Sequence, residues 1–599
     1  MSMRRTFAVI LTAAALAGGA CIAQDRSLAD DWNDFLHYTL IGRLDVAKAY
    51  AQAIIEGDPD PVELLALCKE NPRGHQLLVR AKENKHDPEL ARLSQQLWDI
   101  IERGTLLERS DASLIYDEVK RLSTTKRGYL IAVKRLKRSG EYAIPFMLDA
   151  LADPERRAEW PNIVKALPEI ARPAIRPLVA ALQTTRAEVK AEIIKALSKI
   201  GYPQSLAYLK YVVENDKSAQ LKSLAAQSIR DINPAALNTS AAELFYRLAE
   251  EYYYHAESLK PAEDAEFANI WFWDAQQQRL TRERVDKGYF NELMAMRCCE
   301  SALKADEQFG RAIGMWVAAF FKAESANVEP PQYFGPGHAD AMTYATTAGP
   351  QYLHQALARA VKDNNAYVAL GVIEALAVTA GEKSLFYRLG TAQPLVEALS
   401  FDDRAVKYSA AIAIAAAGPR DMFPERSLVV ENLTEALATS LEPAEQETAQ
   451  WNAQLAHSYA IRALRAMLYL AQTRNPVIDL SAARTTLIRA THADKPDIQT
   501  LAGQALAYFD SPDAQRAIAA MALDQANPMD VRLAAFDSLA VSAKLNASLL
   551  DNQSIDAIYT LVGSLQADPQ LRSAAAAAYG ALNLPSQRAK DLILDQAQS

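Results

Sequence analysis

The sequence contains few cysteines, and none has a spacing that would cross-link a fold. Only Cys21, Cys68, Cys298 and Cys299 occur in 599 residues. Adjacent cysteines on a helix point about 100° apart and cannot form an unstrained bridge. We therefore predict no disulfide framework. We interpret Cys298 and Cys299 as small, buried apolar side chains rather than as a redox switch or a soft-metal site.

Sequence patterns for catalysis are also absent. The eight histidines form no His-x-x-x-His pair and no His-Glu dipeptide, and no Cys-x-x-Cys occurs. The chain has no nucleophile elbow, no phosphate-cradling loop and no dinucleotide fingerprint. His338, near Asp340 on a glycine-containing loop, is the one histidine whose setting suggests more than structure. We predict that the protein is not an enzyme and has no cofactor or metal.

Long apolar runs are lacking except near the N-terminus. There, Arg4 and Arg5 precede an apolar run from Phe7 to Leu16 and a segment of small residues. This order is typical of a secretory signal. We therefore expect residues 1–23 to be removed and the protein to be exported to the periplasm or cell envelope, with no transmembrane segment in the mature chain.

Two details of the leader concern its processing. Cleavage after Ala23 or Ala20 fits the small-residue pattern. Lipid attachment through Cys21 is the less favoured alternative, because Gly18 stands where a lipoprotein signal has an apolar residue. Removal of the leader changes the net charge from −9 to about −11. So acidic a protein is a poor ligand for nucleic acid.

Six stretches of the chain share one pattern of turn residue, aliphatic residue, and then small and aliphatic residues at helical spacing. They are 186–201, 365–381, 403–418, 495–509, 528–543 and 568–582. A shorter amphipathic helix precedes each, as at 174–183 and 392–400. Self-similarity at roughly 30 to 40 residues is typical of stacked helical pairs. We predict an all-α fold, an α-solenoid in which alanine-rich faces permit close packing.

The turn acids and basic residues of these stretches resemble the HEAT-repeat family in its short, phycobilisome-lyase-like variety. Matching units are Asp530-Val531-Arg532, Asp403 near Val406-Lys407, and Asp568 near Leu571-Arg572. The resemblance covers about 141–234 and 350–585 and implies architecture rather than activity. The whole layout is similar to exported repeat proteins of planctomycete type, which implies a bacterial cell-envelope setting.

Between the two arrays the chain becomes rich in aromatic residues. Helices are predicted at 241–259 and 292–321. The second resembles the second helix of a tetratricopeptide repeat, with Cys299 and Asp306 at matching positions and Glu307 where that family has proline. We predict a degenerate tetratricopeptide-like pair.

A short segment between these helices has a different period. In 268–286, Ile270 and Phe272 alternate with Trp271 and Trp273, and a polar break precedes a second strand-like run. This pattern predicts a β-hairpin inserted in a helical protein. Because the ribbon's aromatic faces must be covered, we expect Trp271, Phe272 and Trp273 to contact a partner or to lock the arrays together. The alternative is internal packing on the preceding tyrosine-rich helix.

The sequence thus predicts six segments. They are a signal peptide at 1–23, a helical N-terminal capping region at 24–139, a HEAT-like array at 140–234, tetratricopeptide-like helices with the hairpin at 235–325, a Pro/Gly-containing linker at 326–350, and a second HEAT-like array with a C-terminal cap at 351–599.

One run of basic residues stands out against the acidic composition. Residues 120–140 hold eight basic residues and no acid. Lys134, Arg135, Lys137 and Arg138 are therefore candidate contacts for an anionic polymer or lipid headgroups. The alternative is a solvated face paired with the acidic residues just before it in the sequence.

Together these patterns predict a non-enzymatic scaffold that binds another envelope protein through the concave surface of its repeats. The rival hypothesis is a module that binds carbohydrate or a surface polymer through the hairpin aromatics and the basic run.

Overall fold

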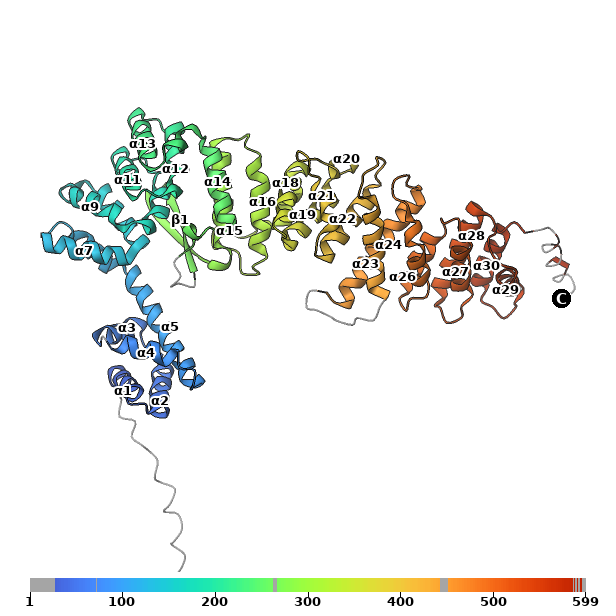
Figure 1. Ribbon diagram of the computed structural model, residues 1–599, viewed down its shortest axis with the longest axis horizontal. Coiled ribbons are helices and arrows are strands. Elements are labelled where there is room, and N and C mark those ends of the chain that lie inside the picture. The colour runs from blue at the N-terminus through green and yellow to red at the C-terminus, as the bar shows by residue number, and fades with distance from the viewer. Residues whose placement is uncertain are drawn as a thin grey trace, which may run out of the picture. The chain divides into compact units, whose positions relative to one another are not determined.

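The computed structural model describes residues 27–71, 73–261, 267–441 and 451–584, with residues 587, 590, 593 and 594. The predicted signal peptide, including Cys21, lies outside them. The described chain is almost wholly helical, and the sheet found in it has two strands. The prediction of an all-α solenoid with a small β-hairpin is confirmed (Figure 1). The chain divides into unit 1, Met1–Ser240 with Pro261–Val285, and unit 2, Ala241–Lys260 with Asp286–Ser599.

Unit 1 contains the first thirteen α-helices and the hairpin. Its elements are α1 (Leu28–Leu40), α2 (Leu44–Glu56), α3 (Pro61–Glu70), α4 (Gly74–Lys82), α5 (Pro88–Ser110), α6 (Ala112–Arg121), α7 (Lys126–Ser139), α8 (Ala143–Ala152), α9 (Trp160–Ala166), α10 (Ile175–Ala181), α11 (Ala187–Ile200), α12 (Leu206–Asn215), α13 (Ala219–Ile232), β1 (Phe267–Asp274) and β2 (Arg279–Asp286).

Helices α1 to α5 form a bundle with its own apolar core. Trp32 and Phe35 of α1, Leu64 of α3 and Leu97 of α5 all belong to this core and are buried. The long helix α5 also packs on α6 and α7, so it connects the bundle to the repeats of the same unit. Towards the end of the unit, α12 packs against α13 within one helical pair, and α11 packs against α13 of the next pair.

Unit 2 is a continuous stack of helices. Its elements are α14 (Ala241–Tyr253), α15 (Lys287–Ala305), α16 (Arg311–Glu324), α17 (Ala341–Ala348), α18 (Pro350–Lys362), α19 (Ala366–Thr379), α20 (Glu382–Leu385), α21 (Pro394–Glu397), α22 (Arg404–Ala417), α23 (Arg426–Leu441), α24 (Ala453–Thr473), α25 (Arg484–Ala490), α26 (Pro496–Leu506), α27 (Pro512–Leu523), α28 (Met529–Asn546), α29 (Asn552–Gly563) and α30 (Pro569–Ala581).

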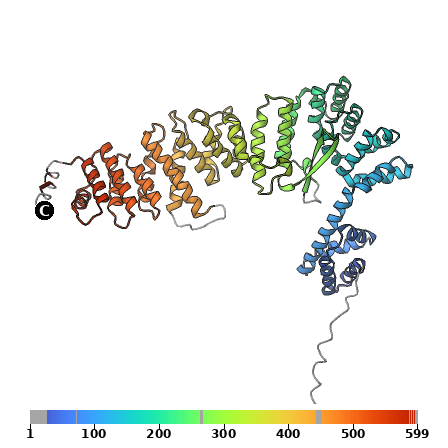
Figure 2. The ribbon, with the colours of Figure 1, turned by 180° about the vertical axis from the view of Figure 1, so that it is seen from behind.

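Within unit 2 the second helix of each pair packs on that of the next. The contacts run from α19 to α22, α24, α26, α28 and α30 in chain order (Figures 1 and 2). Helix α22 shows why these helices are rich in alanine. It packs against α19, α23 and α24 at once, and its Ala410, Ala411, Ala413 and Ala415 are buried. Small side chains permit this close approach on several sides.

Side-chain caps and ion pairs define the repeat boundaries. Asp403 caps α22 by accepting from the backbone N–H groups of Ala405 and Val406, and Asp568 caps α30 in the same way. The basic residue of the pattern reaches the neighbouring helix: Lys407 pairs with Glu435 at 2.7 Å. The turn acid and the basic residue therefore have separate structural roles, one within a helix and one between helices.

Candidate functional site

The hairpin belongs to unit 1, although the helices on either side of it in sequence, α14 and α15, belong to unit 2. Strand β1 packs against α10, and all four residues from Ala268 to Trp271 are buried. The predicted strand positions are thus confirmed. Burial on successive residues means that both faces of this part of the ribbon are covered.

Glu141 anchors the hairpin to unit 1. Gly140, at a φ of 59°, turns the chain at the end of α7 and places Glu141 on a short 3-10 turn before α8. Trp271 Nε1 donates to Glu141 Oε2 (2.8 Å), and Asn269 Nδ2 donates to Glu141 Oε1 (2.6 Å). Arg176 of α10 lies 3.4 Å from the same carboxylate. Since Trp271 is only 5% exposed, its indole is engaged within unit 1.

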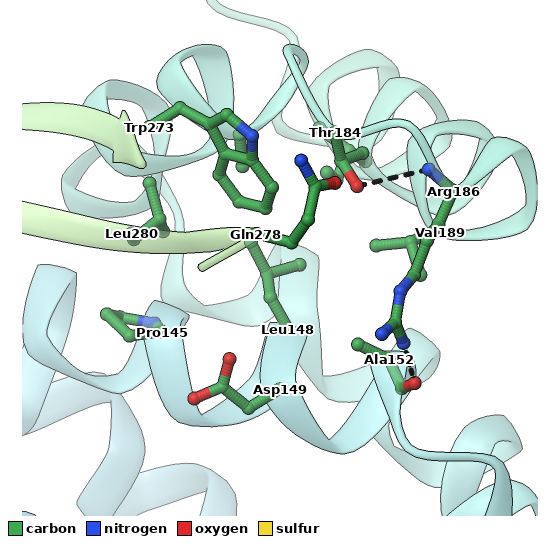
Figure 3. Close-up of a pocket in the computed structure, with 12 residues that line it drawn as sticks. Pro145, Leu148, Asp149, Ala152, Thr184, Arg186, Val189, Trp273, Gln278 and Leu280 are labelled. Atoms are coloured by element: carbon green, nitrogen blue, oxygen red, sulfur yellow. Dashed lines mark hydrogen bonds between the residues drawn. The ribbon is translucent and has the colours of Figure 1, made fainter. Parts of the chain in front are cut away.

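The far end of the hairpin encloses a small cavity (Figure 3). Trp273 and Leu280 close it from the hairpin side, and Leu148 and Asp149 of α8 line the opposite wall. Its volume of about 10 Å³ suits a single water molecule. The buried Trp273 Nε1 has no hydrogen-bond acceptor among the described residues, so a water here would accept from it. Burial raises the pKa of Asp149 despite the nearby Arg279 and Arg186.

The turn of the hairpin is fixed as well. Thr185 Oγ1 donates to Gln278 Oε1 at 2.8 Å. Phe272 and Trp273 are half-buried. The contact of Trp271, Phe272 and Trp273 with a partner stays a prediction. Trp271 itself is packed internally, but on Glu141 of unit 1, whereas the sequence pattern offered the tyrosine-rich helix α14, which belongs to unit 2.

The basic run spans the last two residues of α6, the turn that follows, and α7. Arg135 pairs with Glu118 at 2.5 Å, and Arg121 contacts the same carboxylate at 2.9 Å. Lys137 pairs with Glu169 (2.7 Å). The predicted pairing with acidic residues just before the run thus occurs for Arg135, through Glu118. Lys137 instead pairs with Glu169, which lies further along the chain. Lys134 and Arg138 are exposed, so the four candidate residues divide into two paired and two projecting cations.

The vicinal cysteines are core residues of α15. Cys298 and Cys299 are fully buried, as is nearly all of Cys68, and all three are free thiols. Burial raises the pKa of Cys299 well above its usual value, and it raises that of Cys68 too. This agrees with packing as small apolar side chains.

We expect native protein to react slowly with a thiol reagent at mildly alkaline pH, because buried thiols with raised pKa values hold little thiolate. After denaturation without reductant, Cys68, Cys298 and Cys299 should each be labelled, as peptide mapping would show. A disulfide between any two of them would contradict the prediction.

His338 has a structural setting. Its ring stacks on Phe334 with centroids 4.0 Å apart, and Nδ1 lies 2.8 Å from the carbonyl oxygen of Ala339. In the part of the chain that the structure describes, no three His, Cys, Asp or Glu side chains are grouped to hold a metal ion. No helix among the described residues is long and apolar enough to cross a bilayer.

Unit 2 contains an ionic cluster around the buried Glu292 that sequence patterns did not indicate. Glu292 on α15 lies 2.5 Å from His255 Nε2 and 3.2 Å from Lys322 Nζ, and Lys322 also donates to the carbonyl of Tyr253 (2.6 Å). Burial alone would raise the pKa of Glu292, but His255 and Lys322 outweigh it and hold that pKa below its usual range. Its members come from three segments, so no local pattern joins them. The cluster ties α14, α15 and α16 together.

A second feature missed by the patterns is an apolar edge on unit 2, formed by Val378, Met422 and Tyr469. These side chains lie at the C-terminal ends of α19 and α24 and in the loop after α22, and Val378 is 78% and Met422 69% exposed. The backbone N–H of Arg420 donates to Glu382 (2.7 Å), and Asn475 donates to the carbonyl of Pro419 (2.9 Å). The first bond joins the loop after α22 to α20, and the second joins that loop to the residues after α24.

Comparisons with known proteins support the architecture of part of unit 1. Residues 144–230, from α8 into α13, match the family described as HEAT repeats. No curated protein matches the chain. Among solved structures, UNC-45 from Drosophila melanogaster is 12% identical with a TM-score of 0.31, over 93% of this chain and 78% of that one. She4p is 13% identical with a TM-score of 0.29, over 94% and 88% of the two chains. Likenesses this low assign no function.

Proposed function

We propose that this protein is a non-enzymatic helical-repeat scaffold that binds another protein through unit 2. The observation that carries the proposal is the apolar edge. Monomeric proteins rarely expose several large apolar side chains together without a binding role. Here three successive repeats contribute one each, and stacked repeats commonly present such extended surfaces to partners.

The setting proposed for this scaffold follows the sequence. We propose an exported protein whose partner lies in the cell envelope, on the strength of the N-terminal leader pattern. The likeness of the helices predicted at 241–259 and 292–321 to a tetratricopeptide pair, and of the repeats to the lyase-like and planctomycete types, belongs to the same proposal. The stretch 292–321, predicted as one helix, is divided between α15 and α16. The alternative, a module that binds carbohydrate or a surface polymer, relied on the hairpin aromatics and the basic run. Trp271 is buried and offers no open face to a sugar ring, which favours the scaffold.

Affinity capture from an extract of the native host tests the scaffold proposal. Val378→Asp with Met422→Asp should lower partner recovery by roughly tenfold or more, because a charge at the centre of an apolar contact must be desolvated. Crosslinking mass spectrometry on the wild-type complex should place the partner on α19, α22 and α24.

A matched variant controls for the added charge. Met529→Asp with Leu565→Asp places two carboxylates on other exposed apolar positions of unit 2 and should leave recovery unchanged. If the same amount of partner were recovered with the two double variants, the apolar edge would not be the surface that binds the partner.

A further inference from the structure

Helix α7 presents an outer face that combines aliphatic and basic side chains. Arg127, Leu130, Ile131, Lys134 and Arg138 recur at intervals of three or four residues and so form one stripe. Leu130 is 62% and Ile131 37% exposed. The opposite side of the helix carries the buried Ala132, Leu136 and Ser139. The helix is therefore packed on one side and open on the other.

The cations of this stripe are available for binding. Lys126, Arg127, Lys134 and Arg138 are exposed and have no ion-pair partner within the described residues. The nearby acids are largely occupied: Glu118 receives Arg121 and Arg135, and Glu169 receives Lys137. Asp117 of α6 lines a hollow beside the face. The stripe carries a local positive charge on a chain of net charge −9.

An open hollow of about 500 Å³ adjoins the stripe at the turn between α6 and α7. It is lined by Asp117, Lys120, Arg121, Thr124, Thr125, Arg127, Gly128 and Ile131. Lys120, Arg127 and two threonine hydroxyl groups line this open space together with Asp117 and with Arg121, which pairs with Glu118. The space is large enough for a phosphate-bearing group. Ile131 belongs to both the hollow and the stripe, so the polar and the apolar parts form one surface.

We propose that the outer face of α7 docks on a bilayer that carries anionic headgroups. The cations would face the phosphates, and Leu130 and Ile131 would enter the boundary between headgroups and acyl chains, as in interfacial amphipathic helices. Aliphatic rather than aromatic side chains at the centre of the face favour a bilayer over a single-stranded nucleic acid, whose bases stack on aromatic side chains. A duplex, which is bound mainly through its phosphates, would not need the exposed Leu130 and Ile131. This surface lies on unit 1 and does not depend on partner binding by the apolar edge.

Flotation of the full chain with lipid vesicles tests the proposal. The protein should bind phosphatidylcholine vesicles that contain roughly one third phosphatidylglycerol, and this binding should weaken as salt rises. Lys134→Gln with Arg138→Gln should lower the partition coefficient by roughly tenfold or more. Leu130→Ser should also lower it, which a purely ionic attraction would not predict.

Control variants test whether vesicle binding depends on the outer face of α7 or on any exposed cation or aliphatic side chain. Lys195→Gln with Lys199→Gln removes two exposed cations from α11 of the same unit, and Val378→Ser removes an exposed aliphatic side chain from unit 2; both should float like wild type. Equal flotation of the α7 variants and wild type would overturn the proposal, as would equal binding to pure phosphatidylcholine. A further outcome is that the protein fails to float with vesicles but binds dextran sulfate beads, with Leu130→Ser binding the beads as well as wild type. That result would show that the face binds a soluble polyanion, and it would also overturn the proposal.

Discussion

Replacing Ala411 by glutamate should destabilise unit 2 severely. Ala411 is fully buried on α22, and that helix packs against α19, α23 and α24 at close range. The larger side chain would push these helices apart, and its carboxylate would lie away from water without a partner. We expect a loss on the order of 4 kcal/mol in the free energy of unfolding, measured by urea denaturation followed by circular dichroism.

Ala416→Glu is the matched control for this prediction. Ala416 lies on the same helix but is exposed, so the same substitution adds the same charge at the surface. Its effect should stay within about 0.5 kcal/mol. If Ala411→Glu unfolded at the same urea concentration as Ala416→Glu, the close packing of α22 against its neighbours would be wrong.

Glu141→Ala should release the hairpin from unit 1. The substitution removes the acceptor of Trp271 and the ion-pair partner of Arg176. It also removes one of two acceptors of Asn269, which keeps the hydroxyl of Tyr142. Because buried donors left without acceptors each cost about 1 to 3 kcal/mol, we expect a loss of about 2 to 4 kcal/mol for the docked hairpin. Hydrogen–deuterium exchange should show faster exchange in peptides that cover β1 and β2.

Two further variants make this result specific. Glu141→Gln keeps a single acceptor oxygen and should give an intermediate effect. Glu188→Ala breaks a pair with Arg157 in which both side chains are exposed and should change stability by less than about 1 kcal/mol. Unchanged exchange of the hairpin in Glu141→Ala would show that Glu141 does not hold it.

Local periodicity made most of the architecture predictable. The stretches 186–201 and 403–418 correspond to α11 and α22 almost residue for residue, because a helix that packs on several neighbours must repeat small apolar residues at helical spacing. The hairpin was also predictable from local periodicity. Side chains that alternate with a period of two, as in 270–273, would not gather on one face of a helix, whereas they do so on a strand.

The contacts that fix these elements were not predictable, because they join residues far apart in sequence. Glu141 is more than a hundred positions before Trp271, and nothing local marks it as an anchor. The pairing of Arg135 with Glu118 could be predicted because the two residues are close in sequence, whereas the pairing of Lys137 with the more distant Glu169 could not. Exposure of Val378 and Met422 depends on which helix ends the stack leaves uncovered.

The assignment of the hairpin to unit 1 has a consequence for synthesis. The helices of unit 1 are complete at Ile232, yet the strands that cover Glu141 and Tyr142 lie beyond α14, the first helix of unit 2. A nascent chain that has reached Ser240 therefore holds a finished set of helices with an uncovered carboxylate. Unit 1 can close only after Asp286 has been made, by which time α14 has also emerged. A fragment intended to fold as unit 1 must therefore extend past Asp286. We expect it to be more stable than a fragment that ends at Ser240.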